Sequence, residues 1–300
     1  TFPEWMRDFV VELGLSLILF PLLLIPLYGV FRKAPRTWWL WGSVVGISFL
    51  AFLLLIAPVF IDPMFNDYVP LADAEVRDPI LALARENGME VGEVLQYDAS
   101  RQTTRVSANV SGFLNTMAIR LNDNLLERCT LPEIESVMAH EIGHYVLNHI
   151  YEMLIYLSLI LVGGFAFVRW GFDRVVERWG GNWSISGIGD VAGMPLLAAL
   201  FATYLLVMTP VVNTMIRVNE VEADMFGLNA ERQPDGFAVV ALKLSEYRMM
   251  DPGPLEEWIF FDHPSGRSRI HIEMTWKAEN LSPADVTDTQ DEETSSPISR

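Results

Sequence analysis

Four long apolar runs dominate the chain, and one polar block follows the second run and another follows the fourth. A helix that crosses a bilayer needs about 20 consecutive apolar residues. Each run reaches or nears that length; the runs are Phe9–Phe31, Trp38–Ile61, Ile150–Val168 and Val191–Ile216. A buried core of a water-soluble protein is the alternative explanation for one such run. Four of them predict a membrane protein, mainly α-helical, with about four transmembrane helices.

The first polar block, residues 62–149, contains short amphipathic elements instead of a long apolar run. Asp73–Glu86 carries apolar residues at helical spacing and stops at Asn87-Gly88, which predicts a helix. Three stretches have the composition of strands: Val91–Tyr97, Ser107–Ser111 and Met117–Leu121. The second block, residues 217–280, contains another amphipathic helix, Asp235–Met249. Residues 281–300 are acidic and polar and predict a disordered tail. Residues 1–61 and 150–216 are the two membrane hairpins.

Candidate chemistry begins with an H-E-x-x-H sequence, His140-Glu141-Ile142-Gly143-His144, in a helix-forming run. Thr130 and Glu133 offer a capping box for the start of that helix. Residues four apart share a helix face, so neutral imidazoles at His140 and His144 can hold one zinc ion, with Glu141 as general base. The alternative is a helix that carries two histidines by chance.

A catalytic zinc keeps three protein ligands and one open position. His149 lies five residues past His144, which turns it off the shared face. Downstream, Glu220 and Asp224 are four residues apart, while Glu222 points away from their face. We expect Glu220 to be the third ligand and Asp224 to accept a hydrogen bond from a ligand histidine. A solvated acidic face is the alternative for this cluster on its own.

These paired motifs resemble the M48 membrane metalloproteases, and more closely their Ste24 type, the CAAX prenyl proteases. Three further stretches share that resemblance: Pro63-Met64-Phe65-Asn66 through Leu71, Gly112–Leu126, and His263-Pro264 with Arg269. The resemblance implies a zincin-like α+β protease domain made of a small sheet and the H-E-x-x-H helix. Ste24-type proteins carry further spans upstream, so we expect spans missing before Thr1; HtpX-type members of the family have four spans.

Further residues outside the zinc ligands are candidates for roles in the site. His263 is a candidate oxyanion stabiliser; a loop histidine stacked on aromatic rings is the alternative, and the resemblance to the family's His-Pro element favours the stabiliser. We expect Arg217 and Arg269 to orient Glu220 or the C-terminal segment, with a structural ion pair as the alternative. The resemblance also implies a substrate-binding strand. An edge strand near the zinc is expected to bind the substrate backbone. There the chain has Ser107-Ala108-Asn109 where the family usually shows Asn-Ala-Tyr, so a solvated loop remains the alternative.

The net charge of the chain restricts the classes of molecule that it is expected to bind. The net charge is −17 and the chain has only three lysines, which argues against nucleic acid as a partner. The expected partners are the lipid bilayer and a peptide or membrane protein, a prenylated C-terminus among the candidates. Cys129 is the only cysteine, so no disulfide framework and no cysteine zinc site is expected.

Two arguments from the sequence predict opposite orientations of the chain in the membrane. Basic residues of the loop Arg169–Asp190 and of the first hairpin turn place the protease blocks away from the cytoplasm by the positive-inside rule. The family resemblance implies that the site opens to the cytosol, of a bacterial inner membrane or a membrane like the endoplasmic reticulum, and we adopt that expectation.

The sequence therefore predicts an integral-membrane zinc endopeptidase with one Zn²⁺ per chain. An HtpX-like quality-control protease of misfolded membrane proteins is the second possibility. A zinc-stabilised scaffold or transporter is the third. Transporters usually carry ionisable residues deep in their spans, whereas here only Glu12 and Glu152 lie within the runs, both near an end.

Overall fold

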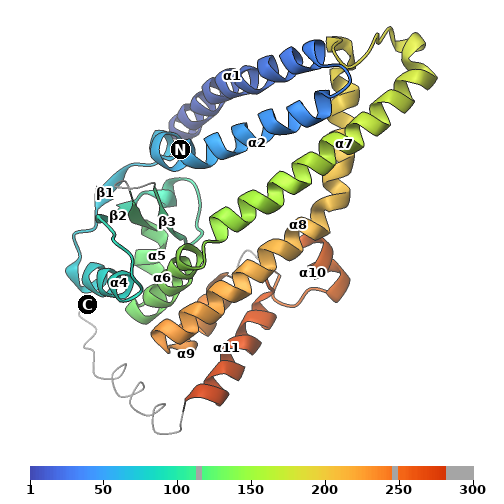
Figure 1. The fold of residues 1–300 in the computed structure, drawn as a ribbon. Helices are drawn as coiled ribbons and strands as arrows, with labels where there is room; N and C mark the ends of the chain where they lie inside the picture. The colour runs from blue at the N-terminus through green and yellow to red at the C-terminus, as the bar shows by residue number, and fades with distance from the viewer. Residues whose placement is uncertain (113–116, 245–248, 282–300) are drawn as a thin grey trace.

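The computed structural model describes residues 1–112, 117–244 and 249–281. Its longest elements are four helices, each long and apolar enough to cross a membrane: Phe2–Lys33, Trp38–Phe65, His149–Trp183 and Val191–Glu231. Figure 1 shows them side by side in one elongated bundle, with a smaller domain of strands and short helices at one end. The four spans predicted from the apolar runs are thus confirmed.

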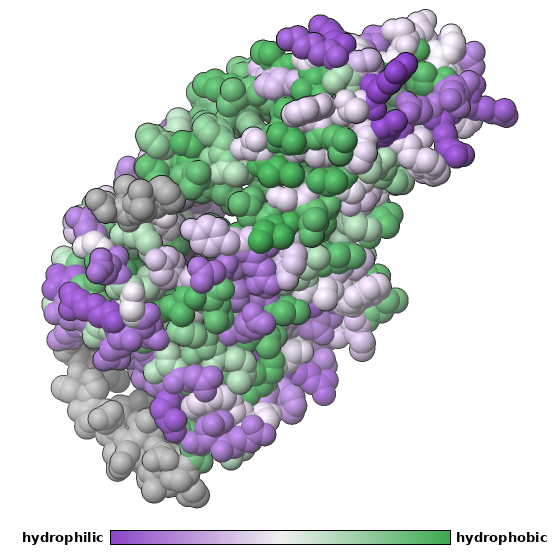
Figure 2. All heavy atoms as spheres, viewed as in Figure 1, coloured by the Kyte–Doolittle hydropathy of each residue, from purple (hydrophilic) through white to green (hydrophobic). Residues whose placement is uncertain are grey.

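The bundle keeps most of its apolar side chains on the outside. Ile25 is 72% exposed and Leu206 is 71% exposed, as a lipid-facing surface requires. Figure 2 shows apolar residues gathered over the bundle, between a polar tip and the polar site domain. Inside the bundle, aromatic rings of α1 (Phe2–Lys33), α2 (Trp38–Ile56) and α7 (His149–Trp183) pack together; they include Phe31, Trp38, Phe165 and Phe172.

One boundary differs from the prediction. The sequence predicted a loop over Arg169–Asp190, whereas α7 continues as a helix to Trp183 and ends at Ser184 with φ 57°. Hydropathy finds only the part of a helix that lies in the hydrocarbon. Charged residues such as Arg174 and Glu177 end the apolar run without ending the helix. The loop prediction was therefore wrong for residues 169–183.

Helix α8 (Met194–Glu231) is also longer than the apolar run from which it was predicted. It leaves the bundle and continues without a break into the site domain, where it carries Glu220 and Asp224 (Figure 1). Its strongest helix–helix contact there is with α6 (Leu131–Val146), the H-E-x-x-H helix. One helix therefore connects the membrane bundle to the proposed metal site.

A mixed sheet of four strands lies beside α6, in the order β1-β2-β4-β3. β2 (Glu93–Tyr97) pairs in parallel with β4 (Ala118–Asn122); β1 (Tyr68–Pro70) and β3 (Ala108–Ser111) are antiparallel to their neighbours. All five residues of β4 are buried, as expected for a central strand. β3 lies at the edge of this described sheet, on the side that contacts α6.

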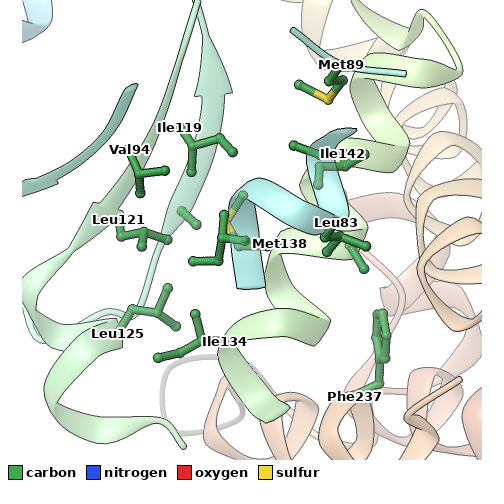
Figure 3. Packing of buried hydrophobic residues seen from close by; sticks show 14 of the residues in the cluster. Leu83, Met89, Val94, Ile119, Leu121, Leu125, Ile134, Met138, Ile142 and Phe237 are labelled. Atoms are coloured by element: carbon green, nitrogen blue, oxygen red, sulfur yellow. The ribbon is translucent and has the colours of Figure 1, made fainter. Parts of the chain in front are cut away.

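The core of the domain lies between the sheet, α6 and α4 (Ala74–Glu86). Figure 3 shows Ile119 and Leu121 of the sheet facing Ile134, Met138 and Ile142 of α6. These apolar positions of α6 face the sheet, so its histidines point elsewhere, towards α8.

The remaining helices are short. They are α3 (Asp62–Phe65), α5 (Asp123–Arg128), α9 (Pro234–Leu244), α10 (Pro254–Phe260) and α11 (Gly266–Asn280), with a π-helical turn at Ala57–Ile61 and 3₁₀ turns at Ala99–Arg101 and Val191–Gly193. The expected helix Asp235–Met249 is present as α9 up to Leu244. Residues 245–248 lie outside the described residues, and Met249 is not helical, so the predicted end of the helix was wrong. The predicted tail lies outside the described residues, apart from Leu281.

Candidate metal centre

The H-E-x-x-H helix starts where its sequence predicts. Thr130 caps α6, and its backbone N–H donates to the Glu133 carboxylate at 2.7 Å, completing the capping box. His140 and His144 follow one turn apart, and their Nε2 atoms approach to 3.1 Å. Both imidazoles therefore direct the same ring nitrogen to a common point.

Glu220 comes to that point from α8. One of its carboxylate oxygens lies 3.4 Å from His140 Nε2 and the other lies 3.4 Å from His144 Nε2. Ligands about 2.0–2.1 Å from a tetrahedral zinc ion are separated by roughly 3.3 Å. Two imidazole nitrogens and one carboxylate, separated by 3.1–3.4 Å, thus fit the donor set of a catalytic zinc site.

Two glycines let the helices that carry these ligands come close. A Cβ on Gly143 would meet the backbone of Ala223 at 3.2 Å. A Cβ on Gly227 would meet the His140 backbone nitrogen at 3.2 Å and the Phe237 ring at 2.5 Å. Any larger residue at either position would separate α6 from α8, and with them the histidines from Glu220.

Behind His140 lies a buried polar chain. His140 Nδ1 is 2.7 Å from the Asp224 carboxylate, and Arg269 of α11 donates to the same oxygen. Burial opposes a charge on His140, but Asp224, followed by Glu220, outweighs burial and raises the pKa of His140 to about 10. A metal ion at Nε2 must displace that proton, so metal binding weakens as the pH falls.

Glu273 stands one turn after Arg269 and is 1% exposed. Among the described residues neither of its carboxylate oxygens has a hydrogen-bond partner. Burial raises its pKa to about 8, although nearby Arg269 opposes that shift. A carboxyl with this pKa is mostly neutral at pH 7, which lowers the cost of leaving it buried beside Asp224.

Glu141 lines a cavity of about 210 Å³ that opens beside the ligands. Burial raises the pKa of Glu141 above its usual value, and the neighbouring histidines oppose that shift without reversing it. One wall of the cavity is apolar and comes from α6 and α9; it contains Val137, Phe237, Val240, Ala241 and Leu244. The arrangement places a carboxylate base and an apolar recess at one opening.

His263 lines the same cavity, and its Nε2 lies 3.4 Å from Glu220. Its Nδ1 is 2.9 Å from the Asp262 carboxylate, which only accepts hydrogen bonds, so Nδ1 carries a proton. His263 Nε2 can then donate only when the ring is doubly protonated. The Arg217 guanidinium donates to the backbone carbonyls of Glu257, Trp258 and Phe261 and so holds the segment that leads to His263.

Of the three residues expected to bind substrate, Ala108 and Asn109 begin β3 and Ser107 directly precedes it. Ser107 and Ala108 line the cavity. Asn109 does not line it; its side-chain oxygen accepts a hydrogen bond from Ser111 Oγ at 2.7 Å. The edge strand therefore passes beside the cavity, and the Asn109 amide is engaged by Ser111 instead of lining it.

Two polar residues near the ligands were missed by the sequence argument. His149 Nδ1 lies 2.8 Å from His144 Nδ1, and His149 Nε2 lies 3.3 Å from Glu222. The argument assumed one continuous helix, whereas α6 ends at Val146 and Asn148 turns the chain with φ 62°. The Asn148-His149 pair after the motif was the signal, since asparagine tolerates the left-handed conformation that ends helices.

Four membrane helices, a small mixed sheet and an H-E-x-x-H helix faced by a glutamate from a second helix define a membrane-embedded metallopeptidase. The chain belongs to peptidase family M48, because a profile of that family matches residues 70–273. Residues 1–67 match a profile described as the CAAX prenyl protease N-terminal region with five membrane helices.

Named relatives agree with this assignment. An uncharacterized metalloprotease of Bacillus subtilis is 31% identical over 95% of this chain and 68% of its own length. CAAX prenyl protease 1 of Saccharomyces cerevisiae is 27% identical over 89% of this chain and 62% of its own length. The crystal structure of S. mikatae Ste24p shares the fold, with a TM-score of 0.80 at 24% identity over 91% of this chain and 67% of that one. The chain thus spans about two thirds of the length of these relatives.

Proposed function

We propose that the chain is a zinc-dependent endopeptidase that hydrolyses peptide bonds in membrane-associated proteins. The observation that carries the proposal is the convergence of His140, His144 and Glu220 beside Glu141 in one cavity. His140, His144 and Glu220 would hold one zinc ion. When bound, zinc supplies Lewis-acid chemistry that polarises a peptide carbonyl and makes water nucleophilic near neutral pH.

The chain's own groups account for the other steps. Glu141 takes a proton from the attacking water and then delivers it to the leaving amine, as general base and general acid. His263, doubly protonated, donates from Nε2 to the oxyanion that develops on the scissile carbonyl; such a donor contributes about 3 kcal/mol. Asp224 and Arg269 hold the orientation of His140 through its Nδ1.

Substrate binding follows from the edge strand and the apolar wall. The backbone of β3 offers a free edge among the described strands, to which an extended peptide can add as a further strand. Val137, Phe237 and Val240 give the recess an apolar lining that suits an aliphatic or aromatic side chain next to the scissile bond. Backbone pairing selects for extended peptides, and the recess selects for one apolar residue.

The physiological substrate class we propose is a membrane-associated protein cut near its C-terminus, prenylated or not, because relatives carry the name CAAX prenyl protease. The long lipid-facing α8 that leads into the site supports a substrate delivered from the membrane surface. We place the site domain on the cytosolic side of the membrane. The second candidate is clearance of misfolded membrane proteins, for which the loosely selective edge strand is equally suited.

The test is cleavage by the purified chain in detergent, with products mapped by mass spectrometry. Three substrates are compared: a farnesylated C-terminal peptide, the same peptide without its lipid, and an unfolded membrane protein. We expect cleavage on one side of an apolar residue, lost with a chelator and restored by Zn²⁺. Preference for the farnesylated peptide supports the first substrate class, and preference for the unfolded protein supports the second. A chelator-resistant activity would contradict the proposed function.

A further inference from the structure

His144 has a buried partner on the ring nitrogen that faces away from Glu220. His149 is 3% exposed, and its Nδ1 lies 2.8 Å from His144 Nδ1. On the other side of the same ring, His149 Nε2 lies 3.3 Å from a Glu222 carboxylate oxygen. His144, His149 and Glu222 therefore form a continuous line of polar contacts that starts at the proposed metal ligand.

The position of the proton on each ring of this line follows from the role of His144 as a metal ligand. A neutral imidazole that gives its Nε2 lone pair to a metal ion carries its proton on Nδ1. His144 Nδ1–H then donates to His149 Nδ1, which must present a lone pair. A neutral His149 consequently carries its proton on Nε2 and donates it to Glu222. Each hydrogen bond in the line fixes the tautomer of the next ring.

We propose that His149 is the positioning residue of His144: it accepts the Nδ1 proton of that ligand and so fixes its tautomer and ring orientation. The inference rests on the proposed function, because it takes His144 as a ligand. It gives each ligand histidine its own buried acceptor, which is Asp224 for His140 and a second imidazole for His144.

A break between two helices creates this contact. In a continuous helix, residue 149 would lie about 140° around the axis from His144, because each residue turns the chain by about 100°. Instead α6 ends, Asn148 adopts φ 62° and ψ 30°, and His149 becomes the first residue of α7. The left-handed residue turns His149 back onto the ring of His144.

A second metal site is the competing explanation, since His149, Glu152 and Glu222 also place ligand atoms within 4.8 Å of one another. Two arguments speak against it. In the proposed line the proton of His149 lies on Nε2 and blocks the nitrogen that faces Glu222. A Glu152 oxygen also accepts a hydrogen bond from the Tyr156 hydroxyl. The Glu222 side chain is 55% accessible, so water can replace it as the acceptor for the His149 Nε2 proton. The essential member of the line is therefore His149.

The experiment measures zinc affinity by chelator competition on the full chain in detergent, with the visible spectrum of the Co²⁺-substituted protein as a second readout. His149→Leu removes the acceptor at similar volume. His149→Asn keeps an amide oxygen near the position of Nδ1. Glu152→Gln is the control, because the competing metal site needs this carboxylate and the proposed line does not.

We expect His149→Leu to weaken zinc binding by about 10–100-fold and to alter the Co²⁺ spectrum, as is typical for loss of a partner of a ligand histidine. His149→Asn should lose less than about 10-fold, because its acceptor remains. Glu152→Gln should bind one zinc per chain with unchanged affinity. A purely structural role for His149 would instead leave the Co²⁺ spectrum of folded His149→Leu unchanged.

Other outcomes overturn the inference in distinguishable ways. Wild-type affinity and spectrum in His149→Leu would refute the role of His149 and leave the zinc endopeptidase intact. Two zinc ions per wild-type chain, with one lost in Glu152→Gln, would show that His149 binds metal through Nε2. Absence of zinc from the wild-type site would refute the proposed function together with the inference.

Discussion

Cys129 provides the clearest residue-scale test of burial in the site domain. The thiol lies at the start of the loop before α6, close to Glu133 and Lys243. Burial raises its pKa to about 11, an effect that Lys243 opposes and Glu133 reinforces. Only the thiolate reacts with alkylating agents, so a thiol with this pKa is nearly inert near neutral pH.

We therefore expect iodoacetamide to modify Cys129 very slowly at pH 8 in the folded chain, with a rate that rises as the pH approaches 11. In the unfolded chain the thiol has an ordinary pKa of about 8.5 and should react rapidly at pH 8. Mass spectrometry of alkylation against pH measures both rates. Rapid modification of the folded chain at pH 8 would show that Cys129 is exposed.

Residues that share a helix face were the ones the sequence could place. His140 with His144, and Glu220 with Asp224, are four apart on continuous helices, so periodicity alone put each pair on one face. His149 was misplaced because its position depends on a single left-handed residue between two helices. The contact of Arg217 with the carbonyls near Phe261 could not be predicted either, since no local sequence pattern links segments about 40 residues apart.

At the scale of elements, the site depends on how closely α6 and α8 approach. Each helix contributes one glycine at the contact: Gly143 lies against Ala223, and Gly227 lies against the backbone of His140. Backbone atoms cannot move aside as a flexible side chain can. The helix pair therefore sets the distance between the two histidines and Glu220.

Gly143→Ala should destabilise the domain by about 1–3 kcal/mol, the usual cost of inserting a methyl group into a packed contact. It should also weaken zinc binding, because the separation moves Glu220 away from His140 and His144. Thermal unfolding and zinc retention in detergent measure the two effects. Gly14→Ala is the matched control: it is also helical, and a Cβ there meets nothing within 4 Å. Equal behaviour of the two variants would contradict the close-packing argument.

Elements were predicted well where an apolar run is long or where one face is apolar. The four spans follow from the length of their apolar runs, although α7 and α8 continue well beyond those runs. The helix at 74–86 and three of the strands follow from periodicity, with boundaries shifted by one or two residues. β1 was missed because it has three residues and ends at a proline, too short for an alternating pattern. α11 was missed because its sequence is largely polar, and tertiary contacts with α9 hold it in place.

At the scale of the whole molecule, charge is distributed along the bundle. Basic residues gather near the tip far from the site domain, where α1 and α7 end; they include Arg32, Lys33, Arg174 and Arg178. The positive-inside rule places that tip in the cytoplasm. The proposed orientation is the reverse, with the site domain in the cytosol, so the two arguments make opposite predictions.

Labelling in intact cells decides between them. Asn182→Cys places an exposed thiol near the tip, and Glu90→Cys places one on the site domain. With the chain in a bacterial inner membrane, a membrane-impermeant maleimide should label Asn182→Cys and leave Glu90→Cys unlabelled until the cells are lysed. The unaltered chain is the background, because its single thiol is poorly reactive. Labelling of Glu90→Cys alone in intact cells would place the site domain outside the cytosol.

The measurement that most directly tests the zinc endopeptidase is metal content together with peptide turnover for Glu141→Gln. Glu141 is adjacent to the ligands and is not one of them, so the variant should keep one zinc per chain while turnover falls by about 10²–10⁴-fold. Glu135→Gln makes the same change on the same helix outside the cavity and should keep both zinc and turnover. Wild-type turnover in Glu141→Gln, or loss of its zinc, would contradict the roles assigned to this site.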